Sequence, residues 1–428
     1  MGNPPPPAEL LAMGPPKGTR RRRGEVVEIA QGQQEEEGAG AIDEGTRVQL
    51  VEAVKGLMRT QISSGRQVGM QVSVYWKGEE VACVCGGGYR TSESKEWKPV
   101  TRDTLLMTYS VCKGVSAVAL MTCVDAGECA YSQPVSSVWK EFGHAGKSTM
   151  SIADAVSHRG GIPGMSGGVI YAHMKALKRG WKYAWDAGMK FVEKYKPEWK
   201  IGTISSYHYV SFSWIIGGIV QFASEKHIYD IVRERIAKKL QVADDMYLGR
   251  LPANEHGRAA LLENPRAYSK VKWSISKSLA SSIEARASVS LGNSKTWRAT
   301  LPSAFVDMHA EGTQLVSAST VEQVVQLMED PSNNVGTRGD DLVANLSLGF
   351  SPWKNFRVHD EGCAFWHCGM GGCIAYGEPK TRFSIAVFKT AYEPISMFDG
   401  ENIPPDVLDI VKAVKEVLRI DVRRYGDV

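Results

Sequence analysis

The segment Ser110-Val111-Cys112-Lys113 is the feature that most constrains the fold, because it stands where an apolar run passes into a predicted helix. Residues three apart share a face of a helix, so the spacing predicts that the Ser110 and Lys113 side chains lie together. The helix that follows is apolar nearly all round, which is typical of a helix buried on every side. Its periodic positions and its stop signal are Val115, Val118, Ala119, Met121 and Gly127.

This pair of side chains can carry nucleophilic chemistry. A serine hydroxyl is a weak nucleophile until a neighbouring base takes its proton. Lys113 can be that base only if burial lowers its pKa. The backbone N–H groups at a helix start also favour negative charge near the serine. Chance matches to Ser-x-x-Lys are common, so the alternative is a helix start with a solvated lysine.

Two further segments, 206–218 and 365–372, complete an ordered set of motifs. With them the chain resembles the serine β-lactamase and penicillin-binding-protein-like superfamily, in its class C β-lactamase-related esterase branch. That branch carries Ser-x-x-Lys, a Tyr-His variant of Tyr-x-Asn followed by Gly-Trp, and a His-x-Gly variant of Lys-Thr-Gly. Segments 157–163 and 197–203 resemble two of its turns. The resemblance covers roughly residues 46–420, and its strength comes from the order of the motifs.

The resemblance implies roles for four side chains. Ser110 corresponds to the acyl-accepting nucleophile and Lys113 to its general base. Tyr207 corresponds to the proton shuttle to the leaving group, and neighbouring cations are expected to lower its pKa. His367 stands at the lysine of Lys-Thr-Gly and is expected to orient Tyr207 or the substrate. Without the other motifs, Tyr207 would be interpreted as a buried aromatic with a hydrogen-bonded hydroxyl.

The resemblance also implies an oxyanion hole formed by the backbone N–H groups of Ser110 and Met370. Gly369 is expected to allow close approach of the backbone on that strand. The predicted substrate-binding residues are Cys368, Gly369 and Tyr209. In this arrangement the side chains of Cys368 and Met370 are incidental to the chemistry.

Three residues depart from the family pattern, and two of them, Tyr209 and His367, bear on the substrate. Tyr209 replaces the asparagine of Tyr-x-Asn, which argues against efficient β-lactamase activity. His367 in place of lysine gives a site that is largely neutral at pH 7, which favours neutral esters over substrates with a carboxylate. Ser213 replaces the usual glycine before Trp214. The complete Ser-Lys-Tyr set with its His-x-Gly third motif favours a serine hydrolase that forms an acyl-enzyme, a carboxylesterase or acyl transferase on a small ester, whereas Tyr209 and Ser213 motivate a non-catalytic alternative. The alternatives are a catalytically weak or inactive structural or binding member of the fold, and a β-lactamase or DD-peptidase-like amide hydrolase.

Composition limits the partners. The net charge is 51 − 47 = +4, which gives no reason to expect a nucleic-acid partner. No run of eighteen apolar residues exists, so no membrane span is expected. The expected partner is a small-molecule ester or amide, and the oligomeric state is left open. No secretory signal is recognisable, so the expected location is cytoplasmic, with the eight cysteines reduced.

No cofactor or metal is predicted. One cluster near the C-terminus is rich in possible ligands, so zinc is the alternative there, although no Cys-x-x-Cys pair or known zinc spacing is present. Its members are His359, Cys363, His367, Cys368 and Cys373.

The chain is predicted to have a disordered tail and one large domain. Residues 1–44 hold proline and charge runs with few large apolar side chains, so they cannot bury enough surface to order. The arginines at 20–23 are interpreted as a solvated charge run, the alternative being a nuclear or anionic-surface signal. Residues 45–428 form the hydrolase domain, and 104–345 contribute most of its helical lobe.

Periodicity predicts helices and strands at both ends of that domain. The fold class is α+β, an α/β sandwich with an antiparallel sheet from both chain ends flanked by terminal helices. The resemblance adds an all-helical lobe, with the active site in the cleft between lobe and sheet. The predicted elements are helices at 44–61 and 406–418, hairpin strands at 71–75 and 80–84 around Lys77-Gly78, and strands at 364–367, 372–376 and 383–389.

Overall fold

The computed structural model describes the regions that build the sheet, its covering helices and most of the helical lobe. These are residues 42–94, 96–163, 176, 179–249, 251–263, 304–305, 315–329, 336–337, 365–369, 371–378, 381–391 and 404–420. The predicted disordered tail, apart from residues 42–44, lies outside the described residues, and so does Met370.

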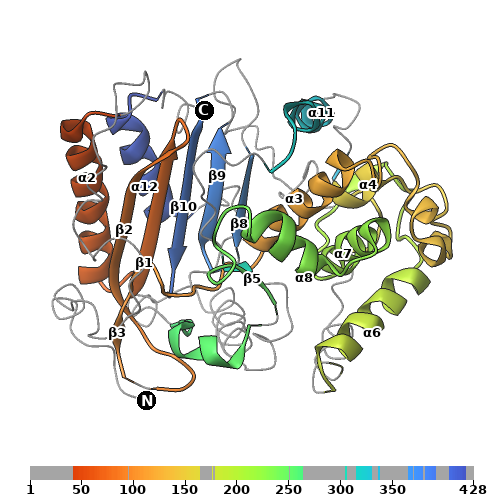
Figure 1. Cartoon of the computed structure of the whole chain (residues 1–428), viewed down its shortest axis with the longest axis horizontal. Coiled ribbons are helices and arrows are strands. Elements are labelled where there is room, and N and C mark those ends of the chain that lie inside the picture. The colour runs from red at the N-terminus through yellow and green to blue at the C-terminus, as the bar shows by residue number, and fades with distance from the viewer. Residues whose placement is uncertain are drawn as a thin grey trace, which may run out of the picture.

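A six-stranded antiparallel sheet joins the two ends of the chain, in the order β3-β2-β1-β10-β9-β8 (Figure 1). The register between β1 and β10 pairs Val72 with Val387, which brings the first and last strands together at the centre of the sheet. Lys77 and Gly78 both have positive φ and make the tight turn of the first hairpin, as predicted. The strands are β1 (Gly69–Trp76), β2 (Glu79–Tyr89), β3 (Lys98–Pro99), β8 (Phe365–Gly369), β9 (Cys373–Glu378) and β10 (Phe383–Lys389).

Two terminal helices cover one face of this sheet. They are α2 (Glu44–Ser63), whose N-terminus is capped by the Asp43 carboxylate, and α12 (Pro405–Val417). Alternate residues of the strands point towards them, as the period of two requires. This apolar layer includes Leu50, Val54, Val72, Val74, Trp366, Ile374, Tyr376, Ile385, Val387, Val407, Ile410 and Val414.

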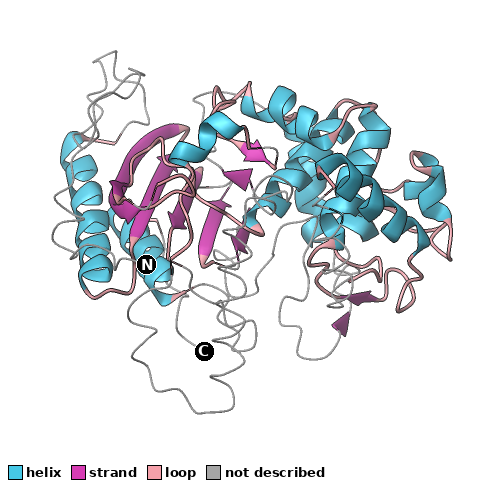
Figure 2. Ribbon diagram, turned by 90° about the horizontal axis from the view of Figure 1, so that it is seen from below, coloured by secondary structure: helices cyan, strands magenta, loops and turns pink. Residues whose placement is uncertain are grey.

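Helices gather on the other side of the sheet and form a separate lobe, which Figure 2 shows well away from α2. The central helix of this lobe is α3 (Val111–Asp125), which contacts β8 and β9. Around it lie α4 (Ile152–Val156), α6 (Trp181–Lys194), α7 (Ser211–Ser224), α8 (Ile228–Ile231) and α11 (Ala318–Glu329). Shorter helical turns are η1 (Val135–Ser137), η2 (Lys140–Gly143), η3 (Val232–Ala237) and η4 (Ala253–Arg258).

Two pairs of short strands complete the described elements. Strand β4 (Ile204–Ser205) is parallel to β7 (Gly336–Thr337), and β5 (Tyr247–Leu248) is antiparallel to β6 (Ala304–Phe305). The α+β prediction is therefore confirmed, with the sheet built from both chain ends and helices on both faces. Within the described part of the chain, no helix combines the length and the apolar character needed to cross a membrane.

Candidate active site

The start of α3 places Ser110 at the boundary between helix and sheet. Ser110 is the N-cap residue and is half-buried, while the preceding Tyr109 has a φ of +48°. The left-handed conformation is uncommon for a residue with a side chain, and it turns the chain sharply into the helix. Nearly every residue of α3 is buried, so the predicted all-round apolar helix is confirmed and the first turn is sealed from water.

Lys113 lies within this sealed turn, beside the serine. Its side chain is buried, and its Nζ donates a hydrogen bond to Ser110 Oγ over 3.1 Å. Burial penalises the ammonium form and lowers the pKa of Lys113 from 10.5 to about 8. The alternative of a solvated lysine at an ordinary helix start is therefore wrong. An amine with this pKa has a substantial neutral fraction near pH 8 and can accept a proton from the serine.

Tyr207 lies in the turn between β4 and α7, over the same lysine. Lys113 Nζ stands 4.9 Å from the centre of its ring. The expectation of a lowered pKa for Tyr207 is wrong. Burial of the phenol raises its pKa well above 10, although a hydrogen bond with Ser110 opposes the rise. Tyr207 is thus a neutral phenol at neutral pH. It can donate and exchange a proton, but it is not present as a phenolate.

Strand β8 supplies the third motif. The His367 ring centre lies 6.2 Å from that of Tyr207, and Nδ1 contacts the Cys368 carbonyl oxygen at 2.7 Å. Its Nε2 has no hydrogen-bond partner among the residues that the structure describes. Burial, together with the nearby Lys113, lowers the pKa of His367 to about 3. The imidazole is therefore neutral, and the third motif brings no positive charge to the site.

Alternation along β8 separates the other predicted residues of this strand. His367 faces α3, whereas Cys368 packs against the opposite apolar layer under α2 and α12. The Cys368 side chain therefore points away from Ser110, and the predicted contact of Cys368 with a substrate stays a prediction. Gly369 lies so close to α3 that a Cβ there would stand 2.2 Å from the Thr108 carbonyl oxygen.

The remaining predicted substrate-binding residue, Tyr209, is half-buried next to Tyr207. Its ring meets the Tyr207 ring edge-on, with centres 4.6 Å apart. The other predicted oxyanion donor, the N–H of Met370, lies outside the described residues, so that pair stays a prediction.

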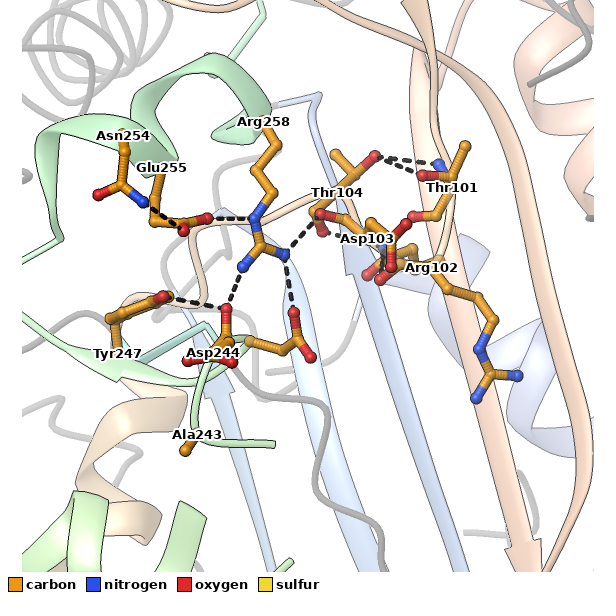
Figure 3. A network of polar contacts seen from close by, with 12 residues as sticks. Thr101, Arg102, Asp103, Thr104, Ala243, Asp244, Tyr247, Asn254, Glu255 and Arg258 are labelled. Carbon is orange, nitrogen blue, oxygen red and sulfur yellow. Dashed lines mark hydrogen bonds and ion pairs between the residues drawn. The ribbon is translucent and has the colours of Figure 1, made fainter. Parts of the chain in front are cut away.

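The chain leading into Ser110 is held by a polar network around Arg258 (Figure 3). Arg258 donates to the Asp103 carbonyl at 3.0 Å and to the Asp245 carboxylate at 2.7 Å, and it also contacts Glu255 and the Asp244 carbonyl. The adjoining backbone is paired as well, because the Leu105 N–H donates to the Arg258 carbonyl. These bonds fix the segment that leads into Ser110.

Two buried histidines, His158 and His208, lie behind Tyr207, and the sequence analysis gave neither a chemical step. The His158 ring is 5.0 Å from that of Tyr207 and 5.3 Å from that of His208. The signal for His158 was present, because it belongs to the turn at 157–163 that resembles a family motif. What the sequence did not show is that this turn packs directly against Tyr207.

The alternative of a zinc site near His367 depends on side chains that could bind a metal ion together. Within the described part of the chain, no group of three or more histidine, cysteine, aspartate or glutamate side chains could hold a metal ion. His359 and Cys363, two members of the predicted alternative cluster, lie outside the described residues.

The fold is an antiparallel sheet with a helical lobe, and a serine, a desolvated lysine and a tyrosine lie where the two meet. This combination defines the class of serine β-lactamases and penicillin-binding proteins. The chain belongs to the Beta-lactamase family, whose model matches residues 50–403. This match confirms the resemblance seen in the ordered motifs.

Among curated proteins, the chain is 27% identical over 201 residues to "Esterase/beta-lactamase LipL" of Mycobacterium tuberculosis (strain ATCC 25618 / H37Rv). That alignment covers 46% of this chain and 43% of the relative. A family VIII carboxylesterase superposes with a TM-score of 0.66 at 22% identity, covering 86% of this chain and 97% of that one. A penicillin-binding protein homologue from Caulobacter crescentus gives 0.65 at 23% identity with the same coverage. At these identities the two structures establish the fold.

Proposed function

We propose that the protein is a serine hydrolase of the esterase type, which forms an acyl-enzyme on Ser110. The observation that carries this proposal is the 3.1 Å contact between Lys113 Nζ and Ser110 Oγ, made by an amine whose pKa burial lowers to about 8. A serine next to a base poised near neutral pH is the arrangement that activates a hydroxyl for attack. The Beta-lactamase family match supports the same assignment.

The proton moves through three groups in this scheme. Neutral Lys113 accepts the proton of the Ser110 hydroxyl as Oγ bonds to the ester carbonyl carbon. When the tetrahedral intermediate breaks the bond to the leaving oxygen, the Tyr207 hydroxyl gives its proton to that oxygen and takes one back from the Lys113 ammonium. An alcohol departs and the serine is acylated. Water then attacks the acyl group by the reverse sequence, which restores Ser110 and releases the acid.

The proposed substrate is a small neutral ester. His367 is uncharged, so the third motif supplies no cation for a substrate carboxylate. Tyr209 provides no side-chain amide for the amide of a β-lactam. The esterase part of the curated relative's name and the carboxylesterase among the structural neighbours agree with ester chemistry. Acyl transfer to another alcohol would use the same acyl-enzyme.

Other parts of the proposal rest on the sequence. The net charge of +4 supports the absence of a nucleic-acid partner. The cytoplasmic location, the tail at 1–44 and the single domain at 45–428 stay predictions.

The test is intact-mass spectrometry after exposure to a fluorophosphonate probe. Wild type should gain one adduct, and Ser110→Ala should gain none while keeping the wild-type circular dichroism spectrum. Ser213→Ala is the matched control, since Ser213 is a half-buried serine in the first turn of α7, and it should label like wild type. An adduct that persists in Ser110→Ala would refute the nucleophile. Absence of an adduct on folded wild type would favour the catalytically inactive member of the fold.

A further inference from the structure

His158 is bonded to both residues that flank the catalytic tyrosine. Its backbone carbonyl accepts the Ser206 N–H at 3.2 Å, and its ring Nδ1 accepts the His208 N–H at 2.9 Å. Tyr207 is the single residue between these two bonds. The backbone on each side of the phenol is therefore tied to the same histidine.

The His158 side chain is fixed in its turn by packing. It is fully buried, its ring stacks on Phe212 with centres 4.6 Å apart, and it lies against the Tyr207 ring. Its φ of +60° is a left-handed conformation, which is uncommon for a residue with a Cβ. Such a conformation persists where the surroundings over-determine it, often at a functional site. No other described side chain accepts from the remaining ring nitrogen, Nε2.

Protonation would break this arrangement. Because Nδ1 accepts a hydrogen bond, the ring hydrogen of neutral His158 sits on Nε2, and a second proton would have to displace the His208 N–H. Burial, and then the nearby His208, Lys113 and His367, hold the pKa of His158 well below 6.5. The ring therefore stays a neutral acceptor while Lys113 changes its charge.

We propose that His158 is a positioning residue for the hydrolysis, which aims the Tyr207 hydroxyl at the leaving-group oxygen by holding the backbone on both sides of the tyrosine. The proposal rests on the proposed function of Ser110, Lys113 and Tyr207. It goes beyond that function because it makes proton delivery by Tyr207 depend on a residue that need not touch the substrate.

The position offers a conservative and a disruptive substitution. His158→Asn keeps an acceptor at the place of Nδ1, and asparagine tolerates the left-handed conformation. His158→Gly also tolerates that conformation but removes the acceptor and the ring. If the glycine variant fails to fold, His158→Gln replaces it, because its longer side chain carries the amide past the His208 N–H.

The experiment compares two esters of the same short acid, one with an alkyl alcohol and one with p-nitrophenol. An alkoxide needs a proton to leave, whereas p-nitrophenolate leaves without one. The quantity to compare is kcat/KM, because it reports acylation, whereas kcat can be limited by hydrolysis of the acyl-enzyme that both esters share. His158→Gly should lower kcat/KM for the alkyl ester by about a hundredfold and lower kcat/KM for the p-nitrophenyl ester far less. His158→Asn should restore most of the alkyl ester rate.

Each other outcome overturns the inference in a recognisable way. Equal loss on both esters would make His158 a merely structural residue. An unchanged kcat/KM of folded His158→Gly on the alkyl ester, or an asparagine variant no better than the glycine variant, would remove the positioning role while leaving Ser110 chemistry intact. A wild type that neither labels with fluorophosphonate nor turns over either ester would refute the proposed function, and the inference with it.

Discussion

Replacing Lys113 with methionine should stabilise the protein at pH 7 while abolishing its activity. The lysine pKa falls from 10.5 in the unfolded chain to about 8 in the folded one because the side chain is buried. This shift of 10.5 − 8 = 2.5 units corresponds to about 3 kcal/mol of unfavourable free energy when the ammonium is fully charged. Methionine fills a similar space without a charge, so Lys113→Met should recover part of that free energy. Loss of the hydrogen bond to Ser110 offsets the rest.

The dependence on pH isolates the charge from other effects of the substitution. Between pH 8 and pH 10.5 the unfolded chain binds more protons at this position than the folded one, so wild-type stability rises with pH in that window. The cost of Lys113 is about 3 kcal/mol at pH 7 and about 1 kcal/mol at pH 10. The stability difference between Lys113→Met and wild type should therefore shrink by about 2 kcal/mol over this interval.

Urea unfolding of both proteins at pH 7 and pH 10 measures this difference, and Lys182→Met, at an exposed lysine of α6, is the control. In the wild type, kcat/KM should rise about tenfold per pH unit below pH 8 and level off above it, because neutral Lys113 is the base. In Lys113→Met it should fall by about 10²- to 10⁴-fold. Either of two results would refute the assignment of a buried, neutral base. One is a difference in unfolding free energy that does not change with pH, and the other is a wild-type kcat/KM that shows no change of slope near pH 8.

Two further substitutions test the packing that supports the site. Gly369→Ala should lower kcat/KM at least tenfold and reduce the free energy of unfolding by about 1–3 kcal/mol, because its Cβ would collide with the Thr108 carbonyl oxygen and push β8 from α3. Wild-type kinetics in this variant would contradict the close approach. Lys415→Met should cost about 3–5 kcal/mol in urea unfolding, because it leaves the buried Glu378 carboxylate without the ammonium 2.5 Å away. The double variant with Glu378→Gln should recover much of that loss, and a double variant no more stable than the single one would show that the buried charge is not the cause.

The sequence by itself determined the local elements and predicted the four central side chains of the site. The alternation of β1 and β10 and the helical spacing of α2 and α12 are visible in the chain, because one face of each element must be apolar. Ser110 and Lys113 are neighbours by helix geometry alone. Tyr207 and His367 were found through the order of the motifs, since nothing local brings residues so distant in the chain together.

The tertiary structure decided what depends on burial and on long-range packing. The pKa of Tyr207 was predicted to fall and instead rises, because desolvation of the phenol outweighs its neighbours. Cys368 was predicted to bind substrate with its side chain incidental to the chemistry, and that side chain lies on the sheet face opposite His367, since the register of β8 places His367 towards α3. His158 could not be assigned a role, because its two bonds around Tyr207 connect segments about fifty residues apart. A pattern in the sequence fixes which face of an element is apolar, whereas the electrostatics of a buried site depend on every segment that excludes water from it.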